Sequence, residues 1–410
     1  MAALNRRVVL IQGAFTAMQC VSTVYFVQAF QRFGYSNLLI GTIMMGTSLM
    51  SLFAQPFWGY VADKVVRDRQ IIGLCCTAGG VLYLGFIFSG GFKPLVIIAA
   101  VGMYALFIPM MTLIDSFVAK LIVDGHRINY SATRAGGSVS YALTAALFGV
   151  AVSRFGMTIA PFIYLALCAV LCGALWGLPD PRNHTRARFS AGAGLRSLRG
   201  NRAYLLFVAA YFLTSLTTVP VNTYYSVVLF TLGGDERHVG LGLFFQALSE
   251  VPVMLSFDWI RKKTGLPTAF FLVLGMVFFA LKNFCIAFAP NITFVLLGSM
   301  LQGLSFAVFL PATVSFLMEV VNREYLATAQ MAAVTIGSSL AAIIANPAGG
   351  AIADVLGPQN MLKITGFFAL AGALMMVLSQ RVLQTGSRVF LQDAKSALSF
   401  KEADDAKDPA

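Results

Sequence analysis

Four charged residues interrupt otherwise apolar stretches of this 410-residue chain: Asp115, Arg134, Glu250 and Lys282. An ionisable side chain is costly in an apolar environment, so such residues usually mark a binding site or a proton pathway. A carboxylate and a forked guanidinium can together hydrogen-bond several hydroxyls of a ligand. A buried carboxylate near an ammonium group can instead take up and release a proton as the two groups separate and approach.

The spacing of Asp115 and Arg134 predicts that they face each other. They lie about ten residues before and after a turn near Asp124, and at about 1.5 Å rise per residue they reach a similar depth on two antiparallel helices. Ser138 and Tyr141 follow Arg134 on one helical stripe. An aromatic ring on that stripe could cover the apolar face of a sugar. The alternative is a structural ion pair with no ligand.

The composition predicts an all-α integral membrane protein. The chain is 58% hydrophobic and 11% charged, which excludes an ordinary soluble domain. Each apolar segment is long enough to cross a bilayer. The segments cover residues 8–31, 38–61, 71–90, 94–121, 128–153, 157–178, 203–230, 239–260, 266–289, 292–319, 327–353 and 361–384.

The positive charges predict the orientation of these twelve segments. Most of the 29 lysine and arginine residues fall in segments that are cytoplasmic if both termini are cytoplasmic, as the positive-inside rule requires. The net charge of +12 is therefore a topology signal, and we expect no nucleic-acid partner. The first and seventh segments are too polar to face lipid all round, and we expect both to line a wet cavity. Their polar residues are Gln12, Thr16, Gln19, Thr23, Tyr25, Tyr211, Thr214, Ser215, Thr218, Asn222 and Tyr225. For each of them, hydrogen bonding between helices is the alternative role.

The chain resembles the lactose permease-like sugar/proton symporters of the major facilitator superfamily. The resemblance rests on Asp115, Phe117 and Lys120, followed by Arg134, Ser138 and Tyr141. In that family these positions bind the sugar, and a tryptophan usually stands where this chain has Tyr141, which leaves the identity of the sugar open. Gln246 occupies the position of a sugar-binding acid on the eighth helix.

The resemblance implies two pseudo-symmetric six-helix bundles around a central cavity. We expect the first bundle at residues 1–181 and the second at 203–384. A basic cytoplasmic linker at 182–202 would join them, and a disordered tail would follow at 385–410. The run GYVADKVVRDR resembles the superfamily signature after the second helix, with Gly59, Asp63 and Lys64 in their usual places. Gly59 would allow tight helix contact, and Asp63 would help to hold the cytoplasmic side closed.

Glu250 is the predicted proton carrier, with Lys282 as its modulator. Lactose permease has a histidine and an acid on its tenth helix, where this chain has Gln302 and Ser305, which cannot titrate. Either the proton site has moved to Glu250, or the protein is a uniporter. A static Glu250–Lys282 bridge between neighbouring helices is the structural alternative.

We therefore expect a monomeric, multi-pass inner-membrane protein that imports a small hydroxylated solute, a saccharide or glycoside, together with protons. The alternatives are a proton-driven multidrug or metabolite exporter and a nucleoside or aromatic-acid carrier. A non-transporting sensor or a membrane enzyme is the rival from another class. No metal-ligand cluster, nucleophile with its base, or phosphate-binding loop stands out in the sequence, so we expect no enzyme activity, cofactor or metal.

Overall fold

The computed structural model describes residues 2–64, 67–126, 128, 130–179, 198–322 and 325–378. Within them, 12 helical spans are long and apolar enough to cross a membrane. The predicted linker and tail lie largely or wholly outside the described residues, so the domain boundaries stay a prediction.

Seven helices and two short segments make up the first six spans. The first span is a broken helix: a π-helical turn, Cys20–Val24, joins α1 to α2. A 3-10 turn, Met157–Ile159, opens the sixth span. The helices of this half are α1 (Ala2–Gln19), α2 (Phe26–Arg32), α3 (Asn37–Lys64), α4 (Asp68–Ile87), α5 (Lys93–Val123), α6 (Tyr130–Phe155) and α7 (Ala160–Trp176).

The second half repeats the pattern of six spans and contains a second π-helical turn, Thr335–Leu340, in the eleventh span. The twelfth span is Pro358–Leu378. The other helices are α9 (Arg202–Thr223), α10 (Tyr225–Thr231), α11 (Glu236–Thr264), α12 (Thr268–Ala287), α13 (Ile292–Ser299), α14 (Gln302–Val320), α15 (Leu326–Val334) and α16 (Ala341–Leu356). The expected all-α membrane fold of twelve helices is confirmed.

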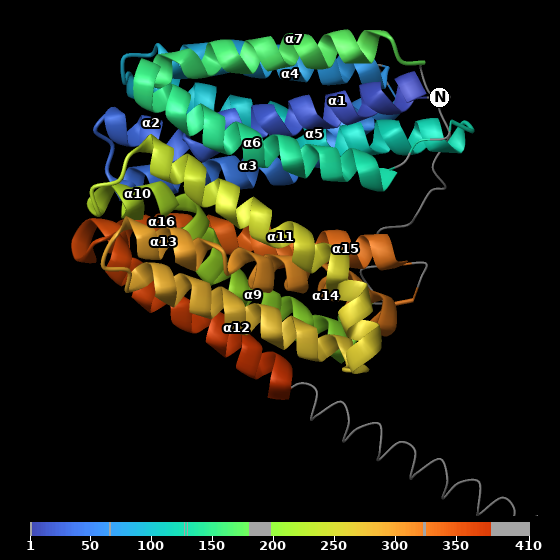
Figure 1. The fold of residues 1–410 in the computed structure, drawn as a ribbon, viewed down its shortest axis with the longest axis vertical. Helices are drawn as coiled ribbons and strands as arrows, with labels where there is room; N and C mark the ends of the chain where they lie inside the picture. Colours follow the sequence, from blue (N-terminus) through green and yellow to red (C-terminus); the bar gives the residue numbers. More distant parts are fainter. Residues whose placement is uncertain are drawn as a thin grey trace, which may run out of the picture.

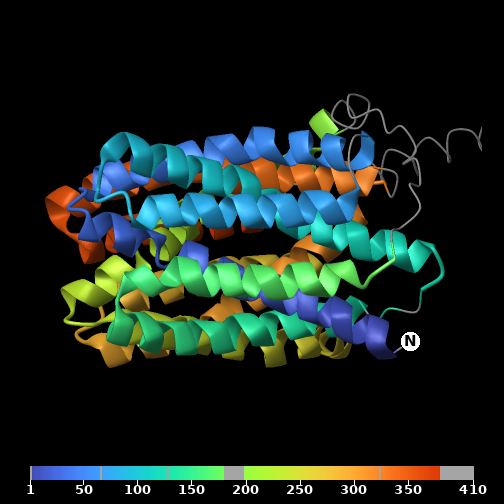
Figure 2. The ribbon, with the colours of Figure 1, turned by 90° about the horizontal axis from the view of Figure 1, so that it is seen from above.

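The two halves lie side by side as separate groups of helices (Figure 1), and the view from above in Figure 2 has the first half in front of the second. The most extensive contacts between them join α3 to α16 and α6 to α11. Glycines allow this close approach, because a Cβ at Gly41 would lie 2.2 Å from the Asn346 carbonyl oxygen, and one at Gly240 would lie 2.2 Å from that of Ala145. Both helix pairs therefore need glycine at these crossings.

Candidate functional site

A cavity of about 770 Å³ lies between the two halves. Its wall includes most of the polar residues predicted on the first and seventh spans, so that prediction is confirmed. From the first span these are Gln12, Thr16, Gln19 and Thr23, and from the seventh Tyr211, Thr214, Ser215, Thr218, Asn222 and Tyr225. Thr16 has both expected roles, because its hydroxyl also donates to the Gly137 carbonyl of α6 at 2.8 Å.

Tyr25 is the exception to that prediction. Its side chain is fully buried, and its hydroxyl donates to the backbone carbonyl of Glu236 in the other half at 3.2 Å. The π-helical turn just before Tyr25 explains the difference, because a wider turn shifts every following side chain off the stripe of a regular helix. Tyr25 therefore belongs to a contact between the halves.

Asp115 and Arg134 do face each other across α5 and α6, as predicted, with Arg134 Nη1 3.3 Å from Asp115 Oδ2. The two side chains are 29% and 44% exposed, respectively. Arg134 is part of the cavity wall, whereas Asp115 is not. Asp115 thus contacts Arg134 without itself being part of the wall. Neither side chain is enclosed by the rest of the protein.

Ser138, Tyr141 and Gln246, the other predicted binding residues, also line the cavity. Ser138 and Tyr141 follow Arg134 along α6, and Gln246 comes from α11 in the opposite half. The structure therefore brings together at one cavity four of the five predicted binding residues. Their role in binding a solute stays a prediction.

Glu250 lines the cavity, but Lys282 lies behind the wall and is only 2% exposed. Lys282 Nζ donates to Gln302 Oε1 at 2.7 Å, and the Gln302 side chain also interacts with the Glu250 carboxyl. Within the described part of the chain, Glu250 and Lys282 form no direct ion pair. The static Glu250–Lys282 bridge, the structural alternative, is therefore not found, and a Lys282–Gln302–Glu250 series takes its place. The proton roles of Glu250 and Lys282 stay a prediction.

Helix packing explains why this bridge does not form. The bridge required α11 and α12 to lie next to each other, as they do in the sequence, but α14 packs against both of them. Gln302, the first residue of α14, is thereby placed between the carboxylate and the ammonium. Sequence reasoning had set Gln302 aside because an amide cannot titrate. Its position in an apolar run, next to Gly303, was the signal that it is held near other polar groups.

The predicted gate motif is described only in part. A Cβ at Gly59 would meet no described atom within 4 Å, so the tight helix contact expected there is absent from this structure. The side chains of Asp63 and Lys64 lie outside the described residues. Nearby, the Lys120 ammonium pairs with the Asp68 carboxylate at 2.9 Å and joins α5 to α4.

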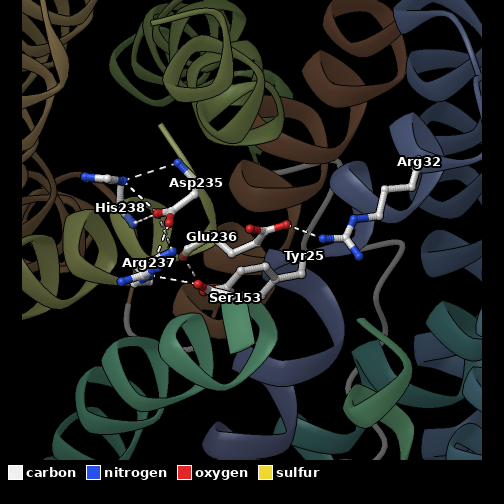
Figure 3. A network of polar contacts seen from close by, with 7 residues as sticks. All are labelled: Tyr25, Arg32, Ser153, Asp235, Glu236, Arg237 and His238. Carbon is white, nitrogen blue, oxygen red and sulfur yellow. Dashed lines mark hydrogen bonds and ion pairs between the residues drawn. The ribbon is translucent and has the colours of Figure 1, made fainter. Parts of the chain in front are cut away.

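The halves are joined by hydrogen bonds at one end of the molecule, the end that holds residues 33–36 and 232–235, which we call the joined end. Figure 3 shows one cluster there: Arg32 pairs with the Glu236 carboxylate, and Arg237 Nε donates to Ser153 Oγ at 2.8 Å. Among the described residues, no hydrogen bond between the halves lies at the opposite end, where the N-terminus is.

Asp354 of α16 forms a second cluster at the joined end. Its Oδ1 accepts from the backbone N–H and the side-chain amide of Asn37, each at 2.9 Å, and its Oδ2 accepts from the Leu38 N–H at 2.8 Å. These N–H groups open α3 and have no partner within that helix. One half therefore caps a helix of the other, a contact that sequence analysis missed because it depends on how the halves pack.

His238 lies in the first turn of α11, whose N-cap is Asp235. The Asp235 carboxylate accepts from the backbone N–H of His238 at 3.3 Å, and its Oδ1 lies 2.7 Å from the His238 ring. Burial raises the pKa of Asp235, but the hydrogen bonds with His238 and the charges of His238 and Arg237 outweigh it, so this pKa lies below its usual value. The carboxylate is thus held ionised beside the start of a membrane span.

No group of three or more histidine, cysteine or acidic side chains within the described residues is placed to hold a metal ion. All six cysteines are free thiols, four of them buried.

The known proteins that this chain is similar to are transporters. The profile of the MFS_1 like family matches residues 14–364. An uncharacterized transporter of Bacillus subtilis, YwbF, is 27% identical over 343 residues, which cover 82% of this chain and 83% of YwbF. The maltose permease of Geobacillus stearothermophilus is 26% identical over 326 residues, which cover 77% and 79% of the two chains.

Among solved structures, the nucleoside transporter NupG matches with a TM-score of 0.78 at 16% sequence identity. The match covers 92% of this chain and 98% of the NupG chain. At this identity the likeness concerns the fold alone, two six-helix halves around a central cavity.

Proposed function

The chain belongs to the MFS_1 like family of major facilitator transporters, and we propose that this membrane transporter is a proton-coupled symporter that imports a saccharide or glycoside. The observation that supports this most directly is the cavity between the halves, with Arg134 of one half and Glu250 of the other in its wall. It supplies a hydroxyl-binding group and a proton-binding group in one chamber. The maltose permease relative is consistent with a sugar-like solute.

In this proposal Arg134, Ser138 and Gln246 hydrogen-bond the hydroxyls of the solute, and Tyr141 covers an apolar face of its ring. Asp115 positions Arg134, because its carboxylate contacts Nη1 of the guanidinium while Arg134 is part of the cavity wall. A guanidinium presents up to five N–H donors in a fixed plane, enough to serve a carboxylate and a ligand at once.

Glu250 carries the proton. The Gln302 amide accepts from Lys282 through its oxygen, which leaves its N–H groups for the carboxylate of Glu250. Ionised Glu250 is an acceptor for these groups, whereas protonated Glu250 is not a full partner for them. Gain and loss of the proton therefore changes how α11 is held to α14 and α12.

We place both termini in the cytoplasm, because most of the basic residues then lie inside. The joined end then faces the outside, and the structure is closed to the outside. Transport requires the Arg32–Glu236 pair and the Asp354 cap to break, so that the same cavity opens outward. Asp63 and Lys64 then help to hold the cytoplasmic side closed.

Proton flux in proteoliposomes with an internal pH dye tests the proposal. Mono- and disaccharides, glycosides, nucleosides and aromatic acids would be added one at a time. The interior of the liposomes should become more acidic when one of the saccharides or glycosides is added. Solute uptake without a pH change would contradict proton coupling. No response to any sugar-like solute would contradict the solute class and favour an exporter.

The Glu250→Gln variant tests whether Glu250 carries the proton. Glu250→Gln should still exchange solute down its gradient yet lose uphill accumulation. Asp258→Asn is the control, because Asp258 is an exposed acid on the same helix. If Glu250→Gln still accumulates solute against its gradient, Glu250 is not the proton carrier.

A further inference from the structure

Two buried tyrosines, Tyr25 and Tyr224, occupy equivalent places in the two halves. Tyr25 follows the π-helical turn of the first span, and Tyr224 separates α9 from α10 in the seventh. Their backbone angles nearly agree, with φ −96° and ψ 10° at Tyr25 and φ −100° and ψ 13° at Tyr224. Both side chains are fully buried. The first span of each half is therefore interrupted at a tyrosine, and we call this pair the crossing tyrosines.

Each crossing tyrosine donates a hydrogen bond to the opposite half. The Tyr25 hydroxyl donates to the carbonyl of Glu236, the first residue of α11, at 3.2 Å (Figure 3). The Tyr224 hydroxyl donates to the carbonyl of Asn37, the first residue of α3, at 3.1 Å. Because α3 and α11 are the second spans of their halves, the two contacts are equivalent as well. The halves are therefore joined by a matched pair of hydrogen bonds.

Both hydroxyls lie where helices of different halves cross at glycines. A Cβ at Gly149 of α6 would lie 2.9 Å from Oη of Tyr25, beside α11. A Cβ at Gly41 of α3 would lie 2.6 Å from Oη of Tyr224, beside α16. These two helix pairs make the most extensive contacts between the halves. Separation of the halves at these crossings must therefore break both hydrogen bonds.

Each of these hydrogen bonds shares a residue with an exposed contact between the halves. Glu236 also pairs with Arg32, and the backbone N–H of Asn37 also donates to Asp354. Attraction between exposed charges is weak and is screened by salt. A hydrogen bond from a buried hydroxyl is not screened in this way. The crossing tyrosines therefore supply a part of the closure that does not depend on salt.

The residues next to the crossing tyrosines line the cavity. Val24 precedes Tyr25, while Thr223 and Tyr225 flank Tyr224, and all three neighbours are part of the wall. A non-helical residue between two helical segments can absorb a change in backbone angles and so act as a hinge. A rearrangement of the wall at these positions therefore moves the adjacent tyrosine and its bond to the opposite half.

We propose that the crossing tyrosines hold the joined end closed and connect that closure to the cavity wall. They are positioning residues, because neither is itself part of the wall. When the joined end opens, Tyr25 loses the carbonyl of Glu236. Tyr224 loses that of Asn37 but keeps the carbonyl of Asn346, which lies in its own half at 2.8 Å. Removal of the Tyr25 hydroxyl should therefore favour opening more than removal of the Tyr224 hydroxyl.

The separation of the halves at the joined end tests the proposal. Double electron–electron resonance would measure it on the full chain in nanodiscs, between labels at the exposed residues Phe155 of the first half and Phe294 of the second. The labels would be attached to introduced keto amino acids, so that the native cysteines stay. Tyr25→Phe should raise the ratio of open to closed molecules about fivefold, and Tyr224→Phe about twofold. The double variant should show the product, about tenfold, if the sites are independent.

Two buried tyrosines whose hydroxyl bonds stay within one half are the matched controls. Tyr35 donates to the Gly91 carbonyl at 3.0 Å in the first half, and Tyr204 donates to the Ala329 carbonyl at 2.9 Å in the second. Tyr35→Phe and Tyr204→Phe should lower the midpoint of thermal unfolding about as much as the crossing-tyrosine variants, because each loses one hydrogen bond. Only the crossing-tyrosine variants should change the ratio of open to closed molecules.

Salt separates the crossing tyrosines from the ion pair beside them. At 1 M salt the Debye length is about 3 Å, so the Arg32–Glu236 pair is screened, and Tyr25→Phe should still raise the ratio. Loss of its effect at high salt would overturn the proposal. Equal shifts in the crossing and control variants, or no shift in either crossing variant, would overturn it too. The measurement uses no solute, so its result is independent of the proposed saccharide and of proton coupling.

Discussion

The two halves hold their intramembrane charges in different ways. In the first half Asp115 and Arg134 touch directly and are both partly exposed. In the second half Lys282 is buried, and the amide of Gln302 lies between it and Glu250. An exposed guanidinium can exchange a partner for a ligand at small cost, whereas a buried ammonium cannot lose its acceptor cheaply. The first pair is therefore suited to binding a solute, and the second series to holding and moving a proton.

The largest effect is expected at Lys282. Lys282→Ala removes the donor to Gln302 and leaves a buried carbonyl unsatisfied beside Glu250, so the free energy of unfolding should fall by about 3 kcal/mol. Uphill transport should be lost as well. Thermal unfolding in nanodiscs measures the loss of stability. Lys363→Ala is the control, because the hydrogen bond from Lys363 to Asn360, near the start of the twelfth span, is exposed. If the two variants were equally stable, the buried contact of Lys282 would contribute nothing to the free energy of unfolding.

Arg134 should matter more for binding than for stability. Arg134→Lys keeps the charge but loses the planar fork, so solute affinity should fall about tenfold or more. Because the pair is exposed, unfolding should change by less than about 1 kcal/mol. Asp115→Asn should weaken binding by a smaller factor, since Asp115 is outside the cavity wall. The comparison between the halves would be wrong if Arg134→Lys destabilised the fold as strongly as Lys282→Ala.

At the joined end, loss of one ion pair should shift the conformational equilibrium modestly. Arg32→Gln leaves Glu236 without its partner across the halves, and the outward-open population should rise about threefold. A cysteine replacing the buried Val239 of the cavity wall would then react faster with an impermeant thiol reagent added outside. The control is Arg154→Gln, because Arg154 is an exposed arginine at the end of α6. An unchanged labelling rate would mean that the Arg32–Glu236 pair does not help to hold the outer side closed.

The smallest effect is expected at the Asp235 cap. The pKa of Asp235 lies below its usual value, so its stabilisation is present above the unfolded-state pKa and is lost as pH falls through the folded-state pKa. Asp235→Ala should cost about 1 kcal/mol near neutral pH. Its stability difference from the unsubstituted protein should disappear in strong acid. Asn291→Ala also removes an N-cap, but its cost should not follow the titration of a carboxylate.

The sequence predicts the features that depend on local spacing and hydropathy. Apolar runs long enough to span a bilayer determine the number of membrane spans. The polar stripes of the first and seventh spans identify the cavity wall, because a regular helix repeats every 3.6 residues. The distance of Asp115 and Arg134 from one tight turn is enough to bring them together, since two consecutive antiparallel helices allow few alternative registers.

Tertiary structure alone decides which distant residues meet. Tyr25 leaves its predicted stripe because a π-helical turn precedes it. Gln302 separates Glu250 from Lys282 because α14 packs between helices that are consecutive in the sequence. Asp354 caps α3 only because α16 of the other half lies against it. Hydropathy specifies that a segment enters the membrane, but packing between helices depends on side-chain fit over the whole molecule, which no local pattern encodes.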